Sequence, residues 1–325
     1  MILVIDARGA KLSRKGVCFE AKSRDGSKEI AAAAVSKILI ASAVSVTTDA
    51  LLLAASEGIP VFFLDGHGDP FGAFDAFETS GNARLRRKQA MIAQTQAGVE
   101  LCKYFLSEKL NGRIRLLKKL MAKRSGAKAR AIGDAILSLE AYIKSILSES
   151  AEDVFTVRDR LQGIEGSAGR AYFGVLSVLL PESESFEGRS FRPAKDRFNA
   201  MLNYAYGILY AQVERAVRLA GLDPHMGIMH ADAYNKPTFV YDAVEMFRYY
   251  AEETVFKLFS GRRAAREMFD ERDGGVFLNE AGRRLLIPAY YKKMSEMTSY
   301  KKRRVKTETE IELRLSAVAK TILES

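Results

Sequence analysis

The long stretch without proline between Pro70 and Pro181 most restricts how this chain of 325 residues can fold. A proline inside a helix removes a backbone hydrogen bond and clashes with the preceding turn, so its absence permits long helices. The stretch is also rich in Ala, Leu, Lys, Arg, Gln and Glu, which favour helices. Apolar residues recur there at helical spacing, at Leu101, Phe105, Leu116, Leu117 and Leu120. Because this texture continues to the end, we expect an all-α domain at residues 85–325.

The first 80 residues are different and predict a small β domain with one helix. Short apolar runs alternate with glycine-rich turns, at 1–5, 17–21, 29–32, 37–40 and 59–64. Thr47–Asp49 is typical of a helix cap before residues 50–57, and Gly58 of a helix end. Residues 65–70 are expected to form a turn. The sequence therefore predicts an α+β protein of two domains, 1–80 and 85–325, with the boundary near residues 79–82.

The bulk composition indicates an intracellular protein with a polyanionic partner. Only two cysteines occur, Cys18 and Cys102, which excludes a disulfide scaffold and fits a reducing cytoplasm. We expect no secretory signal and no membrane-spanning segment, because no apolar stretch is long enough. The net charge of +10 favours nucleic acid, since Lys and Arg displace counterions from phosphates.

Clustering of the basic residues strengthens the nucleic-acid interpretation. Ten Lys and Arg residues but only one acid, Glu108, lie between Lys103 and Arg130, and a second basic run covers 301–306. Three tyrosines near the second run are candidates for stacking on bases or for the core, namely Tyr290, Tyr291 and Tyr300. The alternative is that both basic runs are merely solvated surface.

A set of acids and one histidine is the candidate catalytic site. Glu165 lies in a glycine-rich segment, 163–170, where small residues leave room for a close approach. Asp242 and Glu245 lie three residues apart, on one helix face with mostly apolar neighbours, and His230 precedes them. The alternatives are a solvated glutamate, a core histidine, and a surface acid bridging to Arg248.

Two or three carboxylates with one neutral imidazole form a hard, oxygen-rich donor set that suits Mg²⁺ or Mn²⁺. Buried like charges also require a cation between them. A zinc hydrolase is less favoured, because no H-E-x-x-H helix occurs. The chain has no P-loop, dinucleotide fingerprint or G-x-S-x-G elbow, so nucleotide-driven and serine-hydrolase chemistry have no support.

Several ordered segments resemble the integrase-nuclease family that stands first in the CRISPR-associated protein series and acts in spacer acquisition. The segments lie at 9–14, 58–65, 162–173, 189–204, 221–230 and 236–248. The likeness therefore covers nearly the whole chain.

This resemblance implies a β-sandwich-like N-terminal domain for dimerisation, an all-α catalytic and DNA-binding domain, and a homodimer. It implies one divalent ion, Mg²⁺ or Mn²⁺, held by residues matching Glu165, His230 and Glu245. Asp242 is adjacent, and whether it or Glu245 binds the ion directly is left open. The implied partners are duplex and branched DNA and a small ferredoxin-like CRISPR-associated protein that bridges two dimers, in the cytoplasm of a prokaryote.

The implied reaction is metal-dependent phosphoryl transfer on DNA in antiviral defence. A 3′-hydroxyl of a short duplex attacks a phosphodiester of a CRISPR repeat, and the same site cleaves branched DNA. Four basic side chains near the motifs are candidate phosphate ligands, namely Arg170, Arg192, Lys195 and Arg248. The alternatives are a non-catalytic DNA-binding scaffold and a metal-dependent phosphodiesterase or RNase.

Overall fold

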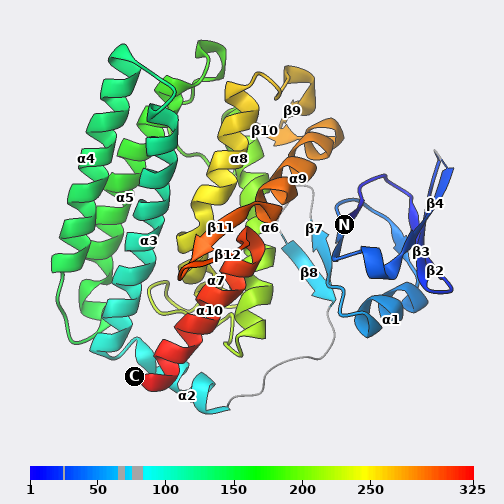
Figure 1. Ribbon diagram of the computed structural model, residues 1–325, viewed down its shortest axis with the longest axis horizontal. Helices are drawn as coiled ribbons and strands as arrows, with labels where there is room; N and C mark the ends of the chain where they lie inside the picture. The colour runs from blue at the N-terminus through cyan, green and yellow to red at the C-terminus, as the bar shows by residue number, and fades with distance from the viewer. Residues whose placement is uncertain (25, 65–69, 75–82) are drawn as a thin grey trace. The chain divides into compact units, whose positions relative to one another are not determined.

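The computed structural model describes residues 1–24, 26–64, 70–74 and 83–325, and the chain divides into two compact units (Figure 1). The smaller unit is built on the N-terminal strands and includes Asn203–Ala211, whereas the larger unit holds most of the helices. Part of the predicted turn at 65–70 and the predicted boundary at 79–82 lie outside the described residues. The exact domain bounds remain a prediction.

The smaller unit contains two four-stranded sheets, as expected for a β-sandwich-like domain. One has the order β1-β5-β7-β8, with β1, β5 and β7 parallel and β8 antiparallel to β7. The other has the order β4-β3-β2-β6, in which β2, β3 and β4 are antiparallel neighbours and β6 runs parallel to β2. The strands are β1 (Ile2–Ile5), β2 (Lys11–Lys15), β3 (Cys18–Ser23), β4 (Gly26–Ala31), β5 (Lys37–Ile40), β6 (Ser45–Val46), β7 (Val61–Leu64) and β8 (Pro70–Phe74).

One apolar core joins both sheets and the helix α1 (Thr48–Ser56). Its members come from each sheet, including Ile38 from the first and Phe19 from the second, both with no exposed surface. The helix begins where the sequence predicted, because the side chain of Thr47 accepts a hydrogen bond from Ala50 N at 3.3 Å. A short 3₁₀ turn, η1 (Ala32–Ala34), connects the sheets.

The larger unit is helical, as predicted, and also carries two short β-hairpins that the sequence did not indicate. The helices are α2 (Ala83–Ile92), α3 (Gln96–Met121), α4 (Gly126–Ser148), α5 (Val154–Leu179), α6 (Arg197–Leu219), α7 (Thr238–Val244), α8 (Arg248–Ser260), α9 (Glu280–Ser295) and α10 (Thr307–Glu324). The 3₁₀ turns are η2 (Glu182–Glu184), η3 (Glu245–Phe247) and η4 (Arg266–Met268). The hairpins are β9–β10 (Phe269–Arg272, Gly275–Leu278) and β11–β12 (Met297–Tyr300, Arg303–Lys306).

Helices α3, α4 and α5 lie side by side and provide the frame on which the site is built (Figure 1). Capping side chains define where the two that carry site residues begin. Thr95 accepts from Gly98 N at 3.3 Å at the start of α3, and Asp153 accepts from Thr156 N at 2.8 Å at the start of α5. The N-termini of α3 and α5 are therefore fixed by side chains that cap the first backbone N–H groups of each helix.

Part of the basic cluster predicted to face nucleic acid lies in the interior. Lys103, Lys109 and Arg113 of α3 are buried, with at most 6% of their surface exposed. Tyr290 and Tyr291 are core residues, whereas Tyr300 is half-buried. The second basic run does face outward, because it forms the exposed β11–β12 hairpin.

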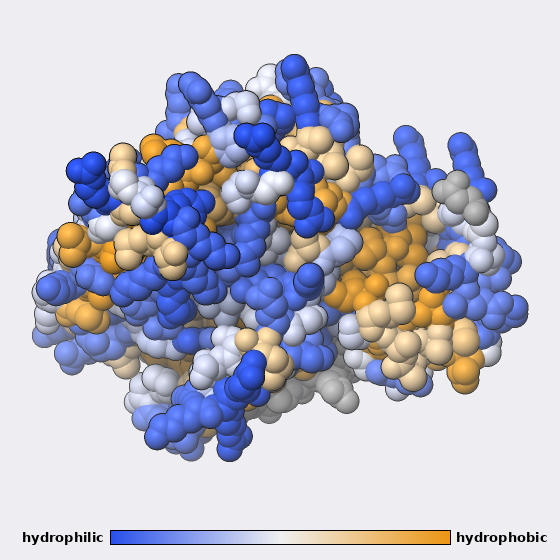
Figure 2. All heavy atoms as spheres, turned by 45° about the horizontal axis from the view of Figure 1, so that its top comes forward, coloured by the Kyte–Doolittle hydropathy of each residue, from blue (hydrophilic) through white to orange (hydrophobic). Residues whose placement is uncertain are grey.

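Figure 2 shows hydrophilic residues over most of the visible face of the larger unit and a larger apolar patch on the smaller one. Among the helices of the described ranges, none combines the length and the hydropathy needed to cross a bilayer.

Candidate active site

The loop before His230 is held rigidly by buried side chains. Gln89 of α2 is 1% exposed, and its amide donates to the carbonyl oxygens of Asp223 and Met226 at 2.8 and 3.1 Å. Its oxygen accepts from Asp223 N at 2.8 Å. A Cβ atom at Gly227 would lie 2.4 Å from the carbonyl oxygen of His230, so only glycine permits this close approach.

Asp242 completes the loop and orients the histidine. It has no exposed surface, and its Oδ2 accepts from the backbone N of Ile228 and Met229 at 2.6 and 3.0 Å. Its Oδ1 accepts from the backbone N of His230 at 3.0 Å and lies 2.6 Å from His230 Nδ1. Both carboxylate oxygens are therefore engaged by the loop.

The imidazole of His230 is fixed by this contact. A proton on Nδ1 donates to Asp242 and leaves the lone pair of Nε2 free to bind a cation. Burial opposes protonation, yet the hydrogen bond and the charge of Asp242, with that of Glu245, raise the pKa of His230 above its ordinary value of 6.5. The ring also packs edge-on against Tyr241, with centroids 5.9 Å apart.

Glu245 lies in η3, directly after α7, and its carboxylate is shared between two cations. Oε1 lies 2.8 Å from a terminal nitrogen of Arg248 and 2.9 Å from its Nε. Oε2 lies 2.5 Å from Nζ of Lys109, which projects from α3. Burial disfavours the charge of Glu245, but Arg248 and Lys109 hold its pKa well below the usual range. The carboxylate is therefore ionised although it is buried.

Glu165 meets the same lysine from α5. Its Oε1 accepts a short hydrogen bond from Lys109 Nζ, and 31% of its side chain is exposed. The neighbouring glycines leave the helix surface bare, because a Cβ atom at Gly163 or Gly169 would meet no atom within 4 Å. This open surface agrees with the space for a close approach that the sequence suggested.

The structure thus brings the four predicted catalytic residues into one neighbourhood and adds a fifth, Lys109. No three His, Cys, Asp or Glu side chains lie close enough to hold a metal ion as they stand, within the residues that the structure describes. The ammonium of Lys109 lies between Glu165 and Glu245 and contacts both carboxylates. The burial of Lys109 could have been predicted from the sequence. Lys109 and Arg113 fall in the apolar stripe of α3, together with Cys102, Leu106, Leu116 and Leu120.

The candidate DNA-contact residues differ in their surroundings. Arg192 and Lys195 are exposed in the segment before α6. Arg170 is exposed on α5, one turn after Gly166, and donates to Ser167 Oγ at 2.9 Å. Arg248 instead pairs with Glu245, the bridge that the sequence left as an alternative. The first three are thus more accessible to a phosphate than Arg248.

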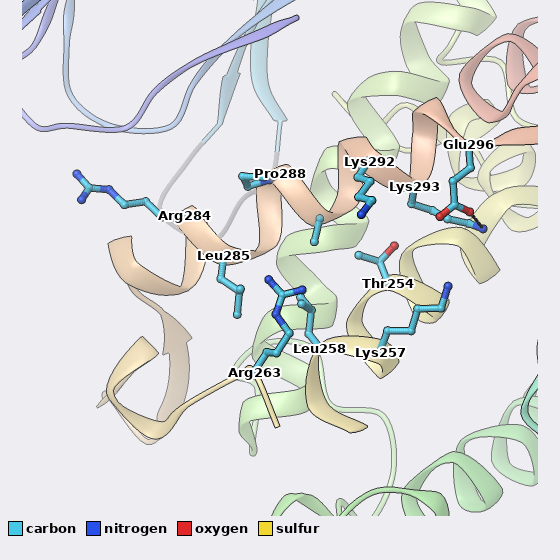
Figure 3. Close-up of a pocket in the computed structure, with 11 residues that line it drawn as sticks. Thr254, Lys257, Leu258, Arg263, Arg284, Leu285, Pro288, Lys292, Lys293 and Glu296 are labelled. Carbon is cyan, nitrogen blue, oxygen red and sulfur yellow. Dashed lines mark hydrogen bonds and ion pairs between the residues drawn. The ribbon is translucent and has the colours of Figure 1, made fainter. Parts of the chain in front are cut away.

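A basic pocket lies between α8 and α9 (Figure 3). Its volume is about 440 Å³, and it is lined by Thr254, Lys257, Leu258, Arg263, Arg284, Leu285, Pro288, Ala289, Lys292, Lys293 and Glu296. Figure 3 shows Arg263 and Lys292 reaching into it from opposite sides. Lys293 is paired with Glu253 and Glu296 at 2.9 and 2.7 Å, and Lys257 with Glu253 at 2.8 Å. None of the predicted site residues lines this pocket.

The protein has a β-sandwich-like unit and a helical unit, and the helical unit contains an acid–histidine cluster. Comparisons with known proteins show the family to which it belongs. The family model described as CRISPR associated protein Cas1 matches residues 3–292. The chain is 31% identical over 315 residues to CRISPR-associated endonuclease Cas1 1 of Archaeoglobus fulgidus, covering 93% of this chain and 91% of the relative. The chain therefore belongs to the CRISPR-associated Cas1 family, which confirms the resemblance inferred from the motifs.

Solved structures show the same fold. A CAS1 protein from Thermotoga maritima matches with a TM-score of 0.81 and 24% identity, over 99% of this chain and 97% of that chain. A casposase bound to integration product matches with a TM-score of 0.83 and 20% identity, over 99% of this chain and 90% of that chain. At these identities the likeness concerns the fold, which confirms the predicted β-plus-helical architecture.

Proposed function

We propose that this chain is a divalent-metal-dependent DNA endonuclease and integrase that inserts short duplexes into a CRISPR repeat array. The observation that carries the proposal is the convergence of Glu165, His230 and Glu245, with Asp242 bound to the far nitrogen of the imidazole. Membership of the Cas1 family supports it, because the relative from Archaeoglobus fulgidus is named an endonuclease. The casposase that shares this fold is bound to an integration product, which agrees with strand transfer as the reaction.

The donor set fits Mg²⁺ or Mn²⁺. Glu165 and Glu245 offer carboxylate oxygens and His230 offers Nε2, a combination typical of hard divalent cations. The two carboxylates already hold one cationic group, the ammonium of Lys109, so positive charge is favoured between them. When bound, the ion would acidify the attacking hydroxyl or water and neutralise charge developing on the scissile phosphate.

The remaining residues orient this set. Asp242 has no free oxygen for a metal, because both accept hydrogen bonds from the 228–230 backbone or from the His230 ring. We therefore assign it to fixing the tautomer and the direction of His230, and assign the direct oxygen ligand to Glu245. Arg248 holds Glu245 in place from one helical turn away.

The proposed substrate is DNA, held through its phosphates. Arg170, Arg192 and Lys195 are the phosphate ligands that we propose near the site, because they are exposed. The pocket between α8 and α9 adds Arg263 and Lys292, neither of which has an acidic partner within the described chain. The exposed basic hairpin β11–β12 offers further positive charge.

We also propose a homodimer that works with the small ferredoxin-like partner, in a prokaryotic cytoplasm. The apolar patch on the smaller unit supports dimerisation through that unit (Figure 2). A chain of a Cas6-RT-Cas1--Cas2 complex matches with 20% identity and a TM-score of 0.77, which supports a partner of this kind.

The test is strand transfer of a labelled short duplex with 3′-hydroxyl ends into a supercoiled plasmid that bears a repeat. It is run with Mn²⁺ or EDTA, and with or without the partner protein. Glu165→Gln and His230→Ala are expected to lower joining by at least about 100-fold, because each removes a metal ligand. Asp159→Asn is the matched control, since Asp159 lies on the same helix as Glu165 with 92% of its side chain exposed.

The outcomes separate the proposal from its rivals. Metal-dependent joining that both variants lose, but the control keeps, supports the integrase. Cleavage of branched DNA without joining supports the nuclease and shows that the partner is required. If wild type and variants bind DNA equally and neither join nor cut it, the protein is a scaffold. If RNA or a chromogenic phosphodiester is cleaved in preference to DNA, the substrate class is wrong.

A further inference from the structure

The side chain of Lys109 is the least expected element of the site. Only 5% of it is exposed, and its ammonium contacts Oε1 of Glu165 and Oε2 of Glu245 together. A lone buried ammonium is costly, so these two carboxylates are what stabilise it there. Lys109 therefore occupies the same pair of anions that the proposed divalent ion requires.

Glu165 depends on this contact more than Glu245 does. Glu245 keeps a second cationic partner, Arg248, on its other oxygen. For Glu165, Lys109 is the only side-chain partner among the described residues. If Lys109 moved away, Glu165 would be an unpaired carboxylate at the edge of open space, free to bind another cation.

An ammonium and a divalent ion cannot both bind these oxygens closely. Like charges at contact distance repel, and both oxygens of Glu245 are already engaged, one by Lys109 and the other by Arg248. The lysine side chain has a flexible four-carbon stem, so its ammonium can leave while its backbone stays in α3. Metal binding must then include displacement of Lys109.

A displaced ammonium needs another anion. The helix α5 that carries Glu165 also offers open surface, where Gly163 and Gly169 leave room for a ligand. The proposed function places one phosphate ligand, the exposed Arg170, on this same helix. A phosphate there would pair with the released ammonium and remove the penalty for displacing it.

We propose that Lys109 is an internal cation that competes with the divalent ion for Glu165 and Glu245, so that metal and DNA bind cooperatively. This inference rests on the proposed function. Without DNA, the competition keeps metal affinity low. With DNA, the ammonium pairs with phosphate and metal affinity rises. Because binding linkage is reciprocal, metal also raises the affinity for DNA.

The test measures Mn²⁺ binding directly, by the electron paramagnetic resonance signal of free Mn²⁺, in the full chain. Lys109→Met removes the competing charge and is expected to bind Mn²⁺ about tenfold more tightly than wild type without DNA. Addition of a short duplex should tighten Mn²⁺ binding of wild type by about the same factor and leave the variant unchanged. Lys103→Met is the matched control, because Lys103 is a buried lysine of the same helix that pairs with Glu100.

Three results would overturn the inference. The first is a folded Lys109→Met protein that binds Mn²⁺ no more tightly than wild type, which would make Lys109 a support for the ligands. The second is an equal effect of DNA on wild type and variant. The third is no Mn²⁺ binding by any of the proteins, with or without DNA. That third result also defeats the proposed metal, whereas the first two leave the proposed function intact.

A measurement on wild type covers the case in which Lys109→Met fails to fold. Lys109 is too buried to react with an amine reagent, and displacement should expose it. Saturating Mg²⁺ with DNA phosphate absent is expected to increase labelling of Lys109 at least severalfold, as followed by mass spectrometry. Labelling of the exposed Lys128 serves as the internal reference. Unchanged labelling of Lys109 under saturating Mg²⁺ would contradict its displacement.

Discussion

Two buried cations lie one turn apart on α3, and their surroundings differ in one decisive respect. Lys109 meets Glu165 and Glu245 at the candidate site, where 31% of the Glu165 side chain and 34% of the His230 side chain are exposed. Arg113 meets Glu252 where 2% of one side chain and none of the other is exposed. The first cluster has an open edge and the second has none.

The closed cluster, Arg113 with Glu252, has the geometry of a stable structural ion pair. The guanidinium of Arg113 binds both carboxylate oxygens of Glu252, at 2.8 and 3.4 Å, and lies over the rings of Tyr172 and Phe173. A guanidinium is always charged and matches a carboxylate with two parallel hydrogen bonds. The ammonium of Lys109 has no such fork and can exchange its partners. The same type of ion pair is therefore structural in one place and exchangeable in the other.

The largest effect in testing this comparison is expected from Arg113→Met, which should lower the stability of the fold. The change removes the guanidinium that binds both oxygens of the buried Glu252 carboxylate, and breaking a buried ion pair in this way costs about 3–5 kcal/mol. In a domain of this size we expect the melting temperature to fall by roughly 6–20 °C, measured by scanning calorimetry. The double variant Arg113→Met with Glu252→Leu should recover most of the loss, because no charge is left unpaired. If single and double variants are equally unstable, the cost lies in packing and not in charge.

The dependence of the free energy of unfolding on acid pH tests the closed cluster further, through Glu253, which is the residue after Glu252. Burial opposes its ionisation, but hydrogen bonds and charges from Lys257 and Lys293 lower its pKa from 4.5 to about 2. A lowered pKa stabilises the fold above pH 4.5, and the stabilisation is lost as pH falls to about 2. Its size is at most about 3 kcal/mol. Urea unfolding of Glu253→Gln should show a flatter dependence on pH between 4.5 and 2 than wild type, and parallel curves would refute this.

At the open cluster, Asp242→Asn is expected to have a smaller effect. An amide cannot accept from all four donors that Asp242 serves, so His230 loses its fixed direction. Loss of such an outer partner weakens metal binding by about 10- to 100-fold, measurable as Mn²⁺ affinity. Asp232→Asn is the control, since Asp232 accepts from Gly227 in the same loop but does not touch the imidazole. Equal affinities for Asp242→Asn and wild type would remove Asp242 from the site.

The smallest effect concerns DNA affinity, away from both clusters. Changing Arg263 and Lys292 of the α8–α9 pocket to alanine should weaken duplex binding by about tenfold or less. The slope of log affinity against log salt should decrease by about 1 to 2, one unit for each lost phosphate contact. Lys320→Ala is the control, because this exposed lysine lies on α10, outside the pocket. An unchanged salt slope in the double variant would exclude the pocket from the DNA path.

Local sequence signals predicted local structure well. Thr47 caps α1 because its hydroxyl reaches a backbone N–H three residues later, which needs no tertiary contact. The composition of the proline-free stretch predicted the long helices in the same way. The two short hairpins were not indicated, because four-residue strands inside a helical texture carry too little periodicity.

The basic cluster of α3 shows where the prediction failed. Lys103, Lys109 and Arg113 were counted toward a nucleic-acid surface, and all three are buried beside acids or carbonyl oxygens. The positions of Lys109 and Arg113 in the apolar stripe of α3 were visible in the sequence. Lys103 pairs with Glu100 of its own helix, whereas the acids that meet Lys109 and Arg113 come from other elements and distant parts of the chain, so those partners could not be predicted.

By itself, the sequence determined which regions form strands and which form helices, the family, and the acid and histidine residues from which a site can be built. These depend on composition, on short-range hydrogen bonds and on ordered motifs, all of which are properties of the chain before it folds. Only the tertiary structure decided that Asp242 orients His230 and that Lys109 lies between Glu165 and Glu245. Burial and pairing of charges are set by how α3, α5 and η3 pack, and this packing cannot be read from any one segment.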